Sequence, residues 1–332
     1  MWRSALGGFL LAASALARES PDCAEPALTI TASSPRPRQG GILAVAARSR
    51  VPLASVTLSD GEHRVAMERV ADGDGRVFHA LWGVDFESTV GMRRASVEAV
   101  DPCGERHSAT WELRVASGRF LEQKLTVDPA YVEPPPSEAE RIREDQEKVA
   151  RVWAAPPTAR LWSRAFRLPV DAPLRKNFGA KRVFNGRPRS RHNGVDLAAS
   201  AGAPVIAPAP ARVALADELY FSGGTIILDH GGGLFTTYFH LSRLDVKAGD
   251  RLDAGAPLGA VGATGRATGP HLHWGARLNG ARVNPLDLLE LPSWPAASPG
   301  STSSEPGTPR PGAPSPGAPA SERTESESRL RR

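Results

Sequence analysis

The sequence predicts a mainly β protein: an N-terminal immunoglobulin-like β-sandwich, a short helical linker and a C-terminal antiparallel β-sheet domain. Short runs of alternating apolar and polar residues recur between Ala27 and Val115, and β-type runs return between Leu161 and Leu291. The 332 residues include 32 glycines and 30 prolines, which favours short strands joined by turns. Because 41% of the residues are hydrophobic and 23% are charged, a wholly disordered chain is excluded.

The first 17 residues have the pattern of a signal peptide. Arg3 precedes an uncharged apolar run from Ala5 to Leu16, and Ala15-Leu16-Ala17 fits a small-x-small cleavage site. The run is too short to span a membrane, and no other stretch approaches 18 apolar residues. We therefore expect an exported protein, periplasmic or secreted, whose mature chain has no integral membrane segment.

The chain has two cysteines, Cys23 and Cys103. This number excludes both a disulfide-dense scaffold and a four-cysteine zinc site. In an oxidising compartment the two are expected to form a disulfide, and two unpaired thiols are the alternative.

Residues 24–118 are expected to form the β-sandwich. About seven strands are indicated by apolar residues two positions apart, such as Leu43 with Val45 and Val56 with Leu58. Chemically reactive residue types do not cluster in this segment. Its three histidines are scattered, and we interpret them as surface or packing residues: His63, His79 and His107.

Residues 119–160 are expected to form a linker with a helix over residues 137–153. Ser137 and Glu140 match a capping box, and Pro156-Pro157 should end the helix. Ile142, Val149 and Trp153 can share one face. The helix should therefore either dock on a neighbouring element or serve as a spacer.

Residues 161–291 should form the second β-domain. Residues 225–228 and 234–239 are expected to be consecutive strands joined by a turn over residues 229–233. Residues 292–332 are rich in Pro, Ser, Gly, Thr, Glu and Arg, so they form a low-complexity tail that is expected to be disordered.

Five of the eight histidines lie between positions 192 and 273, and four of these five fall in three short motifs. In the first, Gly194 would let the loop between His192 and Asp196 curl so that both side chains reach one metal ion. The second is Tyr238-Phe239-His240-Leu241. The third is His271-Leu272-His273, in which the two histidines point to the same face of a strand.

These residue types predict a zinc site. Two neutral imidazoles and one carboxylate suit Zn²⁺ with water in an open fourth position, and zinc lowers the pKa of that water to about 7. His230, beside glycines at a turn, is interpreted as structural.

The segment from about Asn177 to Leu289 resembles the lysostaphin/LytM-type zinc metallopeptidases, which cut peptide bonds in bacterial cell walls. The motifs that carry the resemblance are Asn177-Phe178-Gly179, residues 192–199, residues 202–205, Leu228-Asp229-His230-Gly231, residues 238–242, Gly249-Asp250, residues 262–274 and Asn284-Pro285. The sandwich and the helix resemble, more loosely, the accessory region of exported Gram-negative members.

This resemblance implies one Zn²⁺ per chain, held by His192, Asp196 and His273. It implies that His240 and His271 are the two non-ligand active-site histidines. It further implies a monomeric endopeptidase acting on peptidoglycan stem peptides, with D-Ala–meso-diaminopimelate as the expected bond and no nucleic-acid partner. The alternative is a non-catalytic wall-binding activator of a murein amidase.

One departure from the family concerns the segment before His192. Some members place a tyrosine there that helps to hold the transition state, whereas this chain has Phe184-Asn185-Gly186 and the basic run Arg187–Arg191. Asn185 is a candidate substitute. Residues 158–191 contain eight arginines and two lysines against one aspartate, so the run could bind acidic groups of the substrate or could be a solvated loop.

Overall fold

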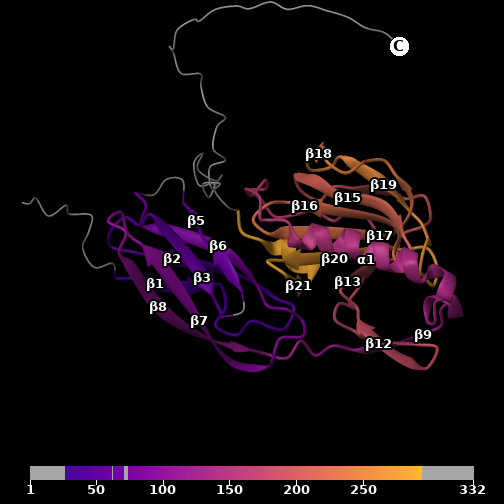
Figure 1. The fold of residues 1–332 in the computed structure, drawn as a ribbon, viewed down its shortest axis with the longest axis horizontal. Helices are drawn as coiled ribbons and strands as arrows, with labels where there is room; N and C mark the ends of the chain where they lie inside the picture. The colour runs from indigo at the N-terminus through magenta and orange to yellow at the C-terminus, as the bar shows by residue number, and fades with distance from the viewer. Residues whose placement is uncertain (1–26, 62, 71–73, 294–332) are drawn as a thin grey trace, which may run out of the picture. The chain divides into compact units, whose positions relative to one another are not determined.

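The computed structural model describes residues 27–61, 63–70 and 74–293 (Figure 1). The expected signal peptide and nearly all of the expected tail lie outside these residues. Cys103 is disulfide-bonded. Its expected partner, Cys23, lies outside the described residues. No helix in the described part of the chain is long and apolar enough to cross a membrane.

The N-terminal region consists of two four-stranded antiparallel sheets, ordered β1-β2-β6-β5 and β4-β3-β7-β8. Their strands are β1 (Thr29–Ala32), β2 (Ile42–Arg48), β3 (Ser55–Ser59), β4 (Arg64–Ala66), β5 (Glu68–Arg69), β6 (Val77–Gly83), β7 (Gly91–Val100) and β8 (Arg106–Val115). Buried and partly exposed residues alternate along β2, as expected for a strand with one face on a core. The alternating pattern is therefore confirmed, whereas the immunoglobulin-like assignment stays a prediction.

The linker begins with β9 (Glu122–Leu125), followed by the 3₁₀ turns η2 (Pro129–Tyr131) and η3 (Pro136–Glu138) and helix α1 (Ala139–Ala154). The helix prediction is confirmed, but the capping box is wrong. The helix starts after Glu138, and no side chain caps its first turn. Ser137 lies inside the η3 turn that begins at Pro136, and the carboxylate of Glu140 pairs with Arg143 instead.

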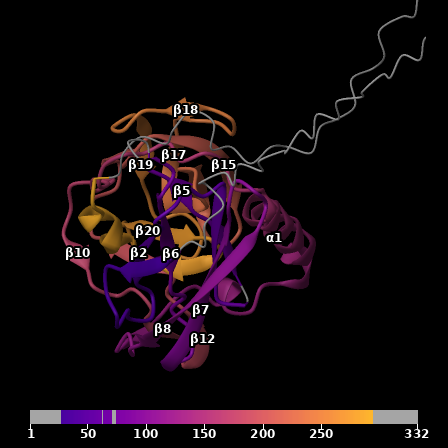
Figure 2. The same ribbon diagram turned by 90° about the vertical axis from the view of Figure 1, so that its left-hand side faces the viewer.

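Helix α1 docks on the C-terminal sheet beside β15 (Ala211–Leu219), as Figure 2 shows from the side. The ring of Trp153 packs edge-on against Phe235, with centroids 5.5 Å apart. Asp145, the buried residue of the helix, accepts a hydrogen bond of 2.7 Å from the backbone N–H of Tyr220. The docking alternative is therefore confirmed.

The C-terminal region is built on a ten-stranded sheet whose main path runs β10-β13-β20-β17-β16-β15-β18. Besides β15, its strands are β10 (Leu174–Arg175), β13 (Gly194–Leu197), β14 (Pro204–Ile206), β16 (Gly223–Asp229), β17 (Leu234–Leu244), β18 (Arg251–Leu252), β19 (Pro257–Val261), β20 (Leu272–Leu278) and β21 (Ala281–Val283). The 3₁₀ turn η4 (Pro285–Glu290) follows. The two expected consecutive strands are confirmed as β16 and β17.

A fourth sheet joins the linker to the C-terminal region. It contains β9, β11 (Lys181–Phe184) and β12 (Arg187–Arg191), with β11 in the centre. Strands β11 and β12 form a hairpin, while β9 pairs parallel to β11 from more than 50 residues upstream. The linker therefore supplies both a strand and a helix to the region that follows it.

We predict that Asp145→Ala destabilises the docking of α1. The substitution leaves the buried N–H of Tyr220 without an acceptor, which costs about 1–3 kcal/mol. Glu147→Ala on the same helix is the matched control. It removes an exposed ion pair with Arg143, so a loss below about 1 kcal/mol is expected. Urea unfolding and hydrogen exchange of α1 measure both; equal losses would contradict the assignment.

Candidate metal centre

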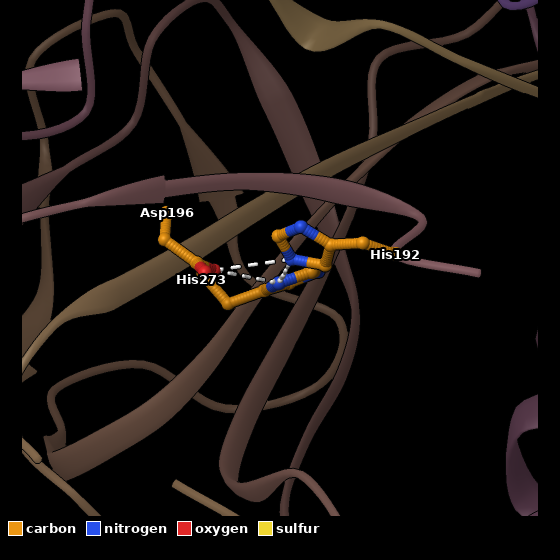
Figure 3. Close-up of side chains that lie close together, drawn as sticks. All are labelled: His192, Asp196 and His273. Atoms are coloured by element: carbon orange, nitrogen blue, oxygen red, sulfur yellow. Dashed lines mark hydrogen bonds and ion pairs between the residues drawn. The ribbon is translucent and has the colours of Figure 1, made fainter. Parts of the chain in front are cut away.

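Strand pairing brings the three expected ligands together. His192 lies two residues before β13, Asp196 lies in β13, and His273 lies in the neighbouring strand β20, where it is the register partner of Asp196. All three are buried, and their ligand atoms lie within 4.8 Å of one another. Figure 3 shows the three side chains pointing toward one another.

The donor atoms in this cluster are one imidazole nitrogen from each histidine and one carboxylate oxygen. Nε2 of His192 lies 2.8 Å from Nδ1 of His273 and 3.1 Å from Oδ1 of Asp196. Nδ1 of His273 lies 3.3 Å from the same oxygen. Three donors converge on one point, as a metal ion with an open coordination position requires.

The imidazoles are held in the form that binds metal. Nδ1 of His192 donates to the backbone carbonyl of Asn177 at 3.0 Å, which leaves the Nε2 lone pair facing the cluster. Burial lowers the pKa of His192 and lowers that of His273 to about 3, so both rings are neutral at pH 7. Neutral imidazoles beside a carboxylate suit zinc.

The carboxylate is charged and fixed in orientation. Oδ2 of Asp196 accepts hydrogen bonds from Nδ2 of Asn177 at 2.7 Å and from Arg182 at 3.3 Å. Although burial acts to raise the pKa of Asp196, contacts with His192 and His273 outweigh it and hold the pKa well below its usual range. Oδ1 remains directed at the cluster.

Asn177 and Arg182 are two supporting residues to which sequence reasoning assigned no role. Asn177 binds His192 through its carbonyl and Asp196 through both ends of its amide, since Oδ1 also accepts from the Asp196 N–H at 3.1 Å. The Asn177-Phe178-Gly179 motif was a visible signal for it. Arg182 lies in a basic stretch and belongs to no motif. Only the position of β11 in the fold brings it to the carboxylate of Asp196.

Gly194 is needed for a different reason from the one predicted. The structure does not place it at a positive φ. Instead, a Cβ there would lie 2.4 Å from the carbonyl oxygen of Trp274 and 2.7 Å from Nε2 of His273. Glycine therefore lets β13 and β20 approach closely at the cluster.

Two further histidines stand beside the cluster, as expected. The rings of His240 and His271 are 4.8 Å apart, and Nε2 of His271 lies 3.7 Å from Oδ1 of Asp196. Each ring donates its Nδ1 proton to a carbonyl at 2.8 Å: His240 to Thr264 and His271 to Gly269. His240 has a φ of 66°, a conformation that non-glycine residues seldom adopt and that is common at functional sites.

His230 lies in the core, apart from the cluster. Its Nδ1 donates to the carbonyl of Pro210 at 2.9 Å, and its Nε2 accepts from Thr236 Oγ1 at 2.7 Å. The side chain is fully buried, and burial lowers its pKa to about 4. These contacts agree with a structural role.

Asn185 does not take the place of the absent tyrosine. Its amide exchanges two hydrogen bonds with the backbone of Val127, at 2.9 and 3.1 Å, so it joins the β11–β12 turn to the linker. Arg187 pairs with Glu133, and Arg191 donates to the carbonyl of Gly179 at 3.1 Å. These two arginines of the basic run are engaged within the chain.

An antiparallel sheet that presents a His/Asp/His cluster with two adjacent histidines defines a domain of the metallopeptidase type. Residues 190–285 match Peptidase family M23. This stretch of the chain is therefore a Peptidase family M23 domain.

Known relatives agree with this assignment. A metalloprotease of uncharacterised function from Haemophilus influenzae is 40% identical over 137 residues, which are 41% of this chain and 27% of that protein. The peptidoglycan DD-endopeptidase ShyA of Vibrio cholerae is 37% identical over 127 residues, 37% of this chain and 30% of ShyA. The match thus spans less than a third of either relative.

A solved structure is similar over a longer stretch. The crystal structure of a putative peptidase M23 from Pseudomonas aeruginosa is 29% identical to this chain. The match covers 76% of this chain and 95% of the other, with a TM-score of 0.58. The similarity therefore extends beyond the family domain.

We predict that Asn177→Ala lowers zinc affinity about 10- to 100-fold, because Asp196 loses both of its contacts with the side-chain amide. The backbone carbonyl that holds His192 is kept. His63→Ala, which removes an exposed histidine in the sandwich, is the control and should leave affinity unchanged. Competition with a chromogenic chelator measures both. Equal affinity in all three proteins would show that Asn177 does not support the site.

We predict that His230 destabilises the protein in mild acid. With a pKa of about 4 in the fold against 6.5 when unfolded, its contribution is complete above pH 6.5 and is lost as the pH falls toward 4. The full loss is about 3 kcal/mol. Urea midpoints between pH 7.5 and 4 should fall more steeply for the wild type than for His230→Gln; parallel slopes would contradict this.

Proposed function

We propose that the chain is a zinc-dependent endopeptidase that hydrolyses peptide crosslinks of bacterial peptidoglycan, with the D-Ala–meso-diaminopimelate bond as its target. The observation that carries the proposal is the complete five-residue set at one place: His192, Asp196 and His273 converge, with His240 and His271 beside them. The name of ShyA supports the substrate class.

The first three residues would hold one zinc ion per chain. Zinc, when bound, would supply Lewis-acid polarisation of the scissile carbonyl and would activate water. The chain's own part is to keep the histidine ligands neutral, which burial does, and to orient the ligands, which Asn177 does through its contacts with His192 and Asp196.

The two other histidines would handle the proton. Because both use Nδ1 as a donor to a carbonyl, both turn an unprotonated Nε2 toward the site. Hydrolysis joins the oxygen of water to the carbonyl carbon and breaks the C–N bond. In our proposal, His271 takes a proton from the attacking water and delivers it to the leaving amine, while His240 orients the water.

The cellular setting is part of the same proposal. The N-terminal pattern at residues 1–17 supports export to the periplasm or secretion, where peptidoglycan is accessible. We propose a monomer whose partner is the stem peptide, with no nucleic acid involved.

We predict that His271→Ala lowers kcat/KM on crosslinked sacculi by about 10²- to 10⁴-fold, because the general base is removed. Zinc content should stay near one per chain, since His271 is not a ligand. Wild-type digestion should release monomeric muropeptides and should stop when a chelator removes the metal. Muropeptide chromatography and metal analysis measure these outcomes.

The matched control is His107→Ala, which removes a histidine paired with Asp101 in the sandwich and should leave activity intact. A wild-type protein that releases no muropeptide by itself, but stimulates an amidase, would overturn the proposal in favour of the non-catalytic activator.

A further inference from the structure

We propose that a pocket between helix α1 and the catalytic sheet is a carboxylate-binding subsite, in which Arg277 binds an acidic group of the substrate peptide. The inference rests on the proposed function and deepens it. The subsite lies outside the five-residue set and is completed by the linker.

The pocket adjoins the metal centre. Its volume is about 130 Å³. The residues of its wall that matter here are Trp153, Asn193, Thr237, Phe239, Arg277 and Arg282. Asn193 directly follows His192, and the ring of Phe239 stacks on that of His273 with centroids 4.8 Å apart and planes 2° from parallel. The ring of Phe239 therefore lies between the pocket and His273, an expected metal ligand.

Strand β20 places Arg277 and His273 on one face of the sheet. Residues two apart in a strand share a face, so His273, Gly275 and Arg277 follow one another along it. Their Cα atoms span about 13 Å, from about 3.3 Å per residue. On β17, Phe235 is the register partner of Arg277. Thr237, two residues further along β17, is the register partner of Gly275.

Gly275 lets β17 and β20 pack closely between these two residues. A Cβ at this position would lie 2.5 Å from Oγ1 of Thr237, 3.2 Å from the carbonyl oxygen of Asn193 and 3.6 Å from Nε2 of His273. Any side chain here would therefore collide with Thr237, which lines the pocket.

Within residues 27–61, 63–70 and 74–293, no ion pair joins the guanidinium of Arg277 to a carboxylate. The guanidinium lies over the ring of Trp153, with its carbon 4.7 Å from the centroid. Arg282, its register partner on β21, is bound to Asp85 and Glu87. Of the two arginines in the pocket wall, Arg277 is therefore the one available to bind an anion.

Burial favours the binding of an anion by Arg277. Burial lowers the pKa of Arg277, which shows that its charge is poorly compensated in the free protein. A partly desolvated guanidinium forms strong bidentate hydrogen bonds with a carboxylate.

The pocket size fits a carboxylate. Its volume corresponds to about four waters at about 30 Å³ each. This space accommodates a carboxylate and the adjoining carbon atoms. In a stem peptide, the group is either a chain-terminal or a side-chain carboxylate.

The test measures binding separately from cleavage. The zinc-loaded, full-length His271→Ala protein is titrated calorimetrically with a crosslinked peptide dimer and with the same dimer carrying carboxamides. Two further dimers, amidated only at the terminus or only at the side chains, identify the source of the carboxylate. Hydrogen bonds to charged groups predict about 10- to 100-fold tighter binding of the free acid.

Adding Arg277→Gln should abolish this preference and leave binding of the amidated dimer unchanged within about twofold. Arg277→Lys should keep part of the preference. Arg243→Gln is the matched control, because it removes an exposed arginine paired with Asp245 and should keep all of it. If Arg277→Gln does not fold, the acid–amide comparison and the lysine variant still decide.

The inference is overturned if acid and amide bind equally, or if Arg277→Gln weakens both by the same factor. These outcomes are distinct from failure of the proposed function. A wild-type protein that cleaves no dimer refutes the endopeptidase, whereas the calorimetric preference for the free acid still decides the subsite. Cleavage without that preference refutes the subsite alone.

Discussion

The antiparallel pairing of β13 with β20 is the constraint on which the site depends. It makes Asp196 and His273, 77 residues apart in the chain, register partners in neighbouring strands. A shift of one residue would turn one of them to the opposite face and dissolve the cluster. Gly194 permits the approach, because any Cβ there would collide with Trp274 and His273. The backbone pairing of the two strands thus determines where the side chains of Asp196 and His273 lie.

Around this pairing, buried polar groups form hydrogen bonds that keep the Asp196 carboxylate charged and the histidine rings oriented. Asn177 holds one imidazole and the carboxylate together, and Arg182 adds a positive charge to the outer oxygen of Asp196. His240 and His271 are oriented by carbonyls rather than by the cluster. The His/Asp/His cluster and the two adjacent histidines are therefore positioned by separate contacts.

The linker is an integral part of the catalytic region. Strand β9 extends the hairpin that carries Arg182, and the Trp153 ring of helix α1 packs on Phe235 and lies beside Arg277. The walls near the metal centre consequently include residues from outside the M23 match at 190–285. Substrate preference in this chain can therefore depend on segments that the family domain does not include.

Local patterns in the sequence determined much of this protein. Alternation predicted the sandwich strands, apolar spacing predicted the docked face of α1, and the histidine motifs singled out the five residues that the fold brings together, because each signal is carried by neighbours in the chain. Tertiary structure alone decided the rest. Asn177 and Arg182 support the site, Asn185 is committed to Val127, the capping box is absent, and Arg277 faces the same side as His273 beneath α1. Those outcomes depend on contacts between distant segments, which local periodicity does not encode.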